Sequence, residues 1–402
     1  MLADFSSLIS NLYPTKNCFF LWVVPRSHLH PPPALMAIPD ELLEEIFLRL
    51  PAAASLARAS AACVSFRRVV AAHPFLRRFR AIHPPPLLGI LCGGLTPAQP
   101  PHPSADADFS CSFLPPSRDR WCLREVRDGR ALFSPALQGT NHNYNPSDLV
   151  KEFAVCDPLH HRYLLLPVLP DHLASQVHPP DTVECETFFA PPGDDEDSSF
   201  RDFRVMCLVR SITKLVLFVF SSCAGRWLAD PITFDVLGCA VVSRRYYAHR
   251  CFCWQIYEAG SMLMLDTGSM EFSTVDLPPS SGPYMPDMVI VEAGGGRFGI
   301  LTISHQIKRD AYHLLYAEQS KDGNGANQWQ YKSVIALPEN HSYSVGGYLL
   351  LTGYPEDDRP IVDYFSLNLQ TFQIEWFCQT GPYAIIGDLY ADFPPSLTTP
   401  SI

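Results

Sequence analysis

Three groups of residues carry side chains that metal binding or acid–base chemistry uses. His160 and His161 are adjacent, Cys251 and Cys253 are one residue apart, and residues 193–199 read GDDEDSS. Neighbouring residues of a strand point to opposite faces, so the two histidines are not expected to share a metal ion. Zinc sites use C-x₂-C pairs and calcium loops use a fixed ligand spacing, and these groups match neither pattern.

Sequence motifs of enzymes are missing as well. The chain has no G-x-S-x-G, no H-E-x-x-H and no phosphate-binding glycine-rich motif. We interpret the histidine pair as part of a surface turn and the acidic run as a solvated loop. The sequence therefore predicts a protein that is not an enzyme and uses no metal ion or other cofactor.

Length and composition limit the partners. A chain of 402 residues is long for one compact domain, and its 38 prolines argue against long helical bundles. The net charge of −11 repels nucleic acid, and no apolar run reaches the roughly 20 residues that cross a bilayer. The 13 cysteines are odd in number and scattered, which indicates reduced thiols and a cytoplasmic or nuclear protein.

Residues 1–35 contain a short apolar run, Cys18–Val24, preceded by only one positive charge, Lys16. We predict that this segment is a disordered or non-native leader, with Met36 as an alternative start. The other interpretation is a signal peptide, which would make Asn340 of the sequence Asn-His-Ser a glycosylation site. That interpretation describes a secreted or luminal β-propeller enzyme or sugar-binding protein.

Residues 36–83 have the pattern of two or three short helices. Pro39 suits the first turn of a helix, acidic residues follow it, and Pro51 ends it. Ser55 is the expected N-cap of a second helical segment that runs to Val70. A unit this small leaves apolar side chains for another surface to cover. That surface is either the rest of the chain or a partner protein.

The stretch IPDELLEEIFLRLP, followed by SLARASAACVSFRRVV, resembles an F-box. The resemblance extends loosely to a group of plant F-box proteins, especially those of grasses. It implies that three short helices bind the adaptor Skp1 and thereby join a cullin-RING ubiquitin ligase, and that the rest of the chain recruits a protein substrate. The residues expected to bind Skp1 are Ile38, Pro39, Leu42, Leu43, Ile46, Leu50, Pro51, Leu56, Cys63 and Phe66. Some of them must instead hold the helices together.

Residues 84–119 are rich in proline, and we predict a linker or loop there. Strand patterns begin at residue 120, with a hairpin over residues 121–133 that turns at Asp128-Gly129. Units of strands then start near Phe203, Cys251, Phe298 and Tyr348. These four starts are nearly evenly spaced along the chain, and an even spacing of strand-containing units predicts a β-propeller. The chain from Leu87 to Cys378 has room for about six such blades.

The predicted fold is thus α+β and multidomain, with an all-α F-box followed by a large all-β domain over residues 120–395 and a tail over 396–402. An irregular pair of β-sandwiches is the alternative for the large domain. The stretch FAVCDPLHHRYLLLPVLP is similar to a signature of F-box-associated, kelch-like propellers, although the double glycine of kelch repeats is poorly kept. The substrate-binding surface is left open.

Overall fold

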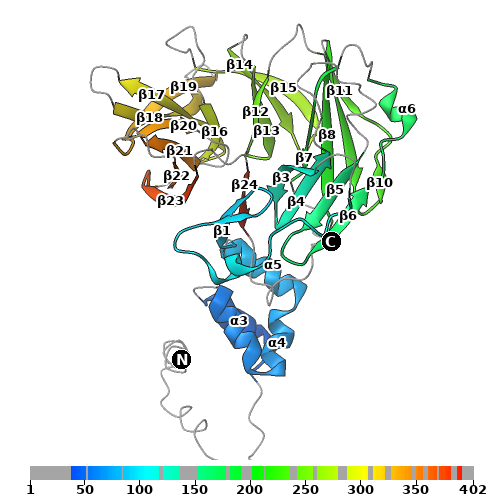
Figure 1. Cartoon of the computed structure of the whole chain (residues 1–402), viewed down its shortest axis with the longest axis vertical. Coiled ribbons are helices and arrows are strands. Elements are labelled where there is room, and N and C mark those ends of the chain that lie inside the picture. Colours follow the sequence, from blue (N-terminus) through cyan, green and yellow to red (C-terminus); the bar gives the residue numbers. More distant parts are fainter. Residues whose placement is uncertain are drawn as a thin grey trace, which may run out of the picture. The chain divides into compact units, whose positions relative to one another are not determined.

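The structure is a computed structural model of the chain (Figure 1). The structure describes residues 38–50, 53–83, 85–116, 121–135, 152–177, 182–191, 202–211, 213–235, 242–256, 260–278, 288–306, 311–321, 327–339, 341–345, 350–355, 361–368, 371–381 and 387–391. The chain divides into two compact units, residues 1–49 and 50–402. The predicted leader, Pro51 and Asn340 lie outside the described residues.

Four helices are described at the N-terminal end: α2 (Asp40–Leu48), α3 (Ala53–Ala62), α4 (Val64–Val70) and α5 (His73–Ile82). The prediction of short helices is confirmed, but two details were wrong. Ser55 lies inside α3 and is not its N-cap. The second helical segment is broken at Cys63, so four helices are described between residues 38 and 83 where two or three were predicted.

The break at Cys63 has a local cause. Its backbone is extended, with φ of −158° and ψ of 164°, and its Sγ accepts the N–H of Phe66 at 3.5 Å. An extended residue whose side chain accepts the N–H three residues later is an N-cap. Cys63 therefore ends one helix and starts the next, a role that serine or threonine usually fills.

The rest of the described chain forms a six-bladed β-propeller, which confirms the predicted large all-β domain. Each blade is one antiparallel sheet. In chain order, blade I contains β3 (Trp121–Arg127), β4 (Arg130–Pro135), β5 (Phe153–Asp157) and β6 (Arg162–Leu166); blade II contains β7 (Thr182–Phe189), β8 (Arg204–Ser211), β9 (Lys214–Ser221), β10 (Arg226–Trp227) and β11 (Ile232–Asp235); blade III contains β12 (Val242–Ala248), β13 (Cys251–Ile256), β14 (Ser261–Asp266) and β15 (Glu271–Asp276); blade IV contains β16 (Met288–Ala293), β17 (Arg297–Gln306), β18 (Ala311–Lys321) and β19 (Asn327–Ala336); blade V contains β20 (His341–Val345), β21 (Leu350–Pro355), β22 (Val362–Leu367) and β23 (Ile374–Thr380).

Blade VI joins the two ends of the propeller. Strand β1 (Leu87–Leu91) pairs with both β2 (Leu95–Pro97) and the last described strand, β24 (Asp388–Ala391). The prediction that residues 84–119 are only a linker was therefore wrong, because two strands of this blade lie there. Proline-rich sequence on both sides makes the two strands hard to recognise, although the sequence LLGIL of β1 is itself apolar and β-forming.

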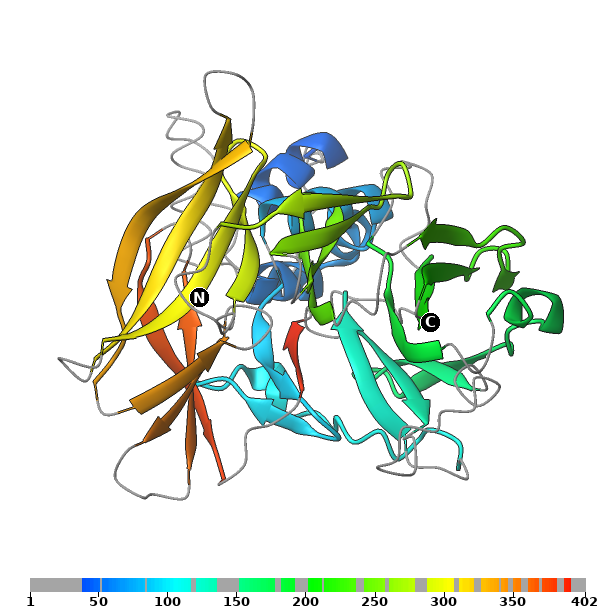
Figure 2. The same ribbon diagram turned by 90° about the horizontal axis from the view of Figure 1, so that it is seen from above.

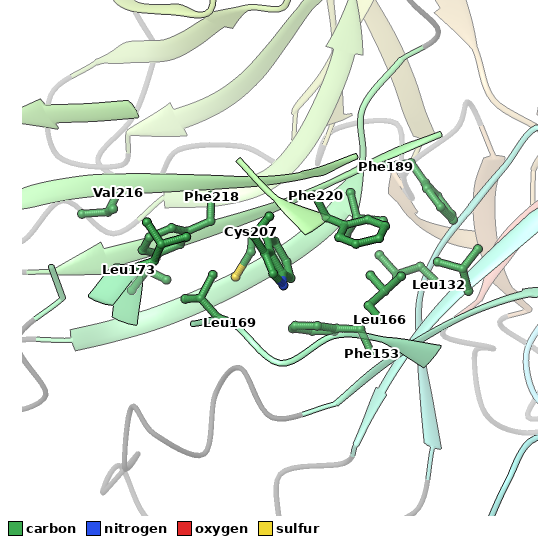
Figure 3. Packing of buried hydrophobic residues seen from close by; sticks show 14 of the residues in the cluster. Leu132, Phe153, Leu166, Leu169, Leu173, Phe189, Cys207, Val216, Phe218 and Phe220 are labelled. Atoms are coloured by element: carbon green, nitrogen blue, oxygen red, sulfur yellow. The ribbon is translucent and has the colours of Figure 1, made fainter. Parts of the chain in front are cut away.

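Buried side chains fill the space between every pair of neighbouring blades. One hydrophobic cluster joins blades I and II, and five more join II to III, III to IV, IV to V, V to VI and VI back to I. Figure 2 shows the sheets arranged around a common centre, and Figure 3 shows the first cluster. In that cluster Leu132 and Phe153 of blade I pack with Phe189 and Phe220 of blade II. The ring is therefore closed by packing as well as by strand pairing.

The predicted hairpin and repeat units are present, although the start of each unit was wrong by one strand. Asp128 and Gly129 form the β3–β4 turn with φ of 51° and 73°, the backbone that a type I′ turn needs. The units predicted from Phe203, Cys251, Phe298 and Tyr348 begin close to β8, β13, β17 and β21. Each of these is the second strand of its blade.

Candidate functional site

The exposed apolar side chains of the N-terminal helical segment make it the candidate site. Ile38, just before α2, is 47% exposed, and Leu42 on α2 is 44% exposed. Pro39 is exposed as well. Leu43 lies one position from Leu42, about 100° around the helix, and is 4% exposed. Residues 38, 39 and 42 thus form a small apolar surface that water covers in the free chain, which we call the α2 surface.

The other predicted docking residues fall into two groups. Leu50 and Leu56 are buried like Leu43, so they hold the structure of the free chain and are not accessible to a partner. Ile46 and Phe66 are half-buried, and Cys63 is exposed. The structure thus separates the exposed candidates from the core residues. The sequence spacing alone could not do so, because both kinds are apolar and recur at helical intervals.

Two exposed apolar residues were missed by the sequence reasoning. Val64 at the start of α4 is 81% exposed, and Ile82 at the end of α5 is 58% exposed. Val64 follows the helix break at Cys63, so its direction depends on a break that the continuous apolar pattern does not show. The signal that would have located Val64 is the N-cap at Cys63, a side chain that can accept a backbone N–H of the first helical turn after it.

The residues first considered for metal or acid–base chemistry have structural roles. His160 and His161 lie at the β5–β6 turn, as predicted, and contact different partners. His160 binds the Asp157 carboxylate at 2.9 Å, and Nε2 of His161 lies 2.6 Å from the carbonyl oxygen of Asp108. Among the described residues, no group of three or more His, Cys, Asp or Glu side chains could hold a metal ion. The acidic run at 193–199 lies outside those residues.

The buried cysteines of the propeller are packing residues. Cys251 and Cys253 share one face of β13 and belong to the cluster between blades III and IV. Burial raises the pKa of Cys253 well above its usual value. Burial, together with the nearby carboxylate of Asp363, raises the pKa of Cys378 to about 12. Cys185 and Cys207 contact each other at 3.3 Å as thiols, and this contact together with burial raises the pKa of Cys207. The cysteines of the described residues are thiols, with no disulfide among them.

An ionic cluster around the buried Glu125 connects blades I, II and III. Glu125 of β3, which is 1% exposed, accepts the backbone N–H of Phe189 in blade II and bonds Arg127 at 2.9 Å. Arg245 of blade III lies 3.3 Å from the same carboxylate and also pairs with Glu186 of blade II. Each charge in the cluster faces an opposite charge, so we interpret it as a structural lock and not as a reaction centre.

The described chain thus combines a short helical segment that has exposed apolar side chains with a large β-propeller. The family comparison then identifies the segment, because residues 35–78 match the F-box domain. Residues 38–83 carry the short helices expected of that domain. F-box domains generally bind Skp1 in cullin-RING ligases.

Comparison with curated proteins finds no match. Among solved structures, the chain is similar to a protein from Lactobacillus plantarum, with 8% identity over 65% of this chain and 71% of that one and a TM-score of 0.30. It is also similar to Synechocystis apocarotenoid oxygenase, with 10% identity over 79% and 69% of the two chains and a TM-score of 0.35. A dihydro-heme d1 dehydrogenase has 11% identity over 64% of this chain and a TM-score of 0.30, and the chain spans 47% of its length. Similarity at such low identities and TM-scores says nothing about the activity of this protein.

Proposed function

We infer that this protein is the substrate-recognition subunit of a Skp1–cullin–F-box ubiquitin ligase. The F-box would bind a Skp1-type adaptor, and the propeller would recruit a protein substrate for ubiquitination. The observation that carries this proposal is the F-box match at residues 35–78, in which Ile38 and Leu42 are exposed. The protein itself would catalyse nothing.

The docking surface has the chemistry of a helix-in-groove contact. Apolar side chains on one end of a helix enter a hydrophobic groove and act as anchors. Full burial of an Ile or Leu side chain is worth about 1.5–3 kcal/mol. We therefore expect the α2 surface to supply much of the affinity. Ile46, Cys63 and Phe66 are further candidate contacts, whereas Leu43, Leu50 and Leu56 are buried.

The proposal also covers the cellular compartment, the domain limits and the type of propeller. Cysteines that stay thiols throughout the described residues fit a reducing compartment, so we place the protein in the cytoplasm or nucleus. None of the described helices is long and apolar enough to cross a membrane. We keep the division into a leader at 1–35, an F-box at 36–83 and a tail at 396–402, and we start the propeller at Leu87. The likeness to kelch-like propellers of plant F-box proteins belongs to the same proposal.

Reconstitution tests the proposed assembly. The full-length protein is mixed with purified Skp1 and a cullin, and the complex is followed by size-exclusion chromatography. We expect a ternary complex that contains all three chains and forms only when Skp1 is present. A protein that elutes alone in every mixture would exclude the ligase role. Capture of bound proteins under proteasome inhibition would then identify the substrate.

A further inference from the structure

Two cysteines of blade II lie in direct contact. Cys185 is on β7 and Cys207 is on β8, and their sulfur atoms are 3.3 Å apart. In the strand register Cys185 is opposite Val209, and Cys207 is opposite Thr187. The two cysteines are therefore diagonal neighbours, and because side chains alternate along a strand, both point to the same face of the sheet. That face packs in the cluster between blades I and II.

The two thiols differ in their access to water. Cys207 is fully buried, whereas Cys185 is half-buried. The contact with Cys185 and the burial both raise the pKa of Cys207 well above its ordinary value, so this thiol keeps its proton. A small oxidant therefore reaches Cys185 first, and a second thiol already lies beside the sulfur that it oxidises. One accessible thiol with an adjacent resolving thiol is the arrangement typical of redox-sensitive cysteines.

We propose that Cys185 and Cys207 are an oxidation site, at which hydrogen peroxide forms a disulfide that fastens β7 to β8. In the first step the sulfur of Cys185 attacks a peroxide oxygen and becomes a sulfenic acid. The O–O bond breaks, and the leaving hydroxide takes up the thiol proton as water. In the second step the sulfur of Cys207 attacks the sulfenic sulfur, the S–O bond breaks, and a second water leaves with the proton of Cys207. The two thiols thus lose two electrons, which one molecule of peroxide takes up.

The disulfide requires only a small movement of the two strands. The sulfur atoms must approach from 3.3 Å to the disulfide length of about 2.0 Å. The cross-link would close a loop over residues 186–206, which include the acidic run at 193–199. Closing a loop restricts the unfolded chain, so the oxidised protein should be harder to unfold than the reduced one. A reversible disulfide also agrees with the reducing compartment proposed above, where the disulfides that do form are mostly transient.

Peptide mapping of the full-length protein tests the proposal. The protein is treated with hydrogen peroxide, its remaining thiols are blocked with N-ethylmaleimide, and it is digested with pepsin at low pH so that disulfides do not exchange. We expect two peptides joined through Cys185 and Cys207, which dithiothreitol separates again. The matched control is C223S, which removes an exposed thiol between β9 and β10 and should give the same joined peptides. Absence of the joined peptides from wild type would overturn the proposal.

Two serine variants test the role of each thiol. C207S lacks the resolving thiol, so peroxide should leave Cys185 as a sulfenic acid that dimedone labels several-fold more than in wild type. In C185S the buried Cys207 should stay reduced. Dimedone label on Cys207 of C185S would contradict the assigned roles. Circular dichroism shows whether each variant is folded, and the peptide map of wild type decides the proposal even where a variant folds poorly.

Urea unfolding tests whether the disulfide fastens the two strands. After peroxide treatment the unfolding midpoint should rise in wild type and in C223S, and dithiothreitol should return it to its starting value. C185S should show no such rise, because it cannot form the bond. No rise in oxidised wild type, or an equal rise in C185S, would contradict the proposed cross-link between β7 and β8.

Discussion

Glu125 offers a test of how the propeller is held together. Replacement by alanine removes a side chain that is 1% exposed and that blades II and III both contact. Two guanidinium groups and one backbone N–H then lose a shared carboxylate acceptor. Arg245 keeps its pairing with Glu186, whereas Arg127 loses its bond of 2.9 Å. Removal of one partner from a buried ion pair costs about 3–5 kcal/mol, so we expect a loss of that size in the free energy of unfolding.

Urea unfolding followed by circular dichroism measures this loss. E125Q keeps an oxygen that can accept the N–H of Phe189 and loses only the charge, so its destabilisation should be smaller than that of E125A. The control is E271A, because Glu271 on β15 is exposed, and its change should stay within about 0.5 kcal/mol. If E125A and E271A unfold at the same urea concentration, the cluster does not lock the blades and our reasoning about it is wrong.

Three further predictions concern glycine packing, ring closure and cysteine exposure. A Cβ at Gly89 would lie 2.1 Å from the carbonyl oxygen of Thr96, so G89A should lower the melting temperature by several degrees, while G94A, which has open space, should not. Deletion of residues 387–402 removes β24, so limited proteolysis should cut the truncated ring at much lower protease concentrations than the intact protein. In the native protein, Cys63 should react quickly with a maleimide while Cys253 stays unmodified until urea is added, as peptide mass spectrometry can show.

Local patterns in the sequence predicted much of this fold. The Asp128-Gly129 turn needs only two residues with positive φ, and the regular steps between blades need only strands of similar length. Local patterns could not predict that β1 pairs with β24 and closes the ring, because the two strands are almost 300 residues apart in the chain. The division of the docking residues also needed coordinates. Leu42 and Leu43 are adjacent leucines on one helix, and only packing decides that the second is buried.

Binding of Skp1 through the α2 surface is the central claim, and isothermal titration calorimetry of the full-length protein tests it most directly. We predict a measurable Kd for wild type and an affinity at least about 100-fold weaker for I38D/L42D, because two apolar anchors become charges that the groove must desolvate. L228D/V334D, which changes two exposed apolar residues of the propeller, serves as the matched control and should bind like wild type. Wild type that gives no binding heat, or I38D/L42D that binds as tightly as wild type, would contradict the claim.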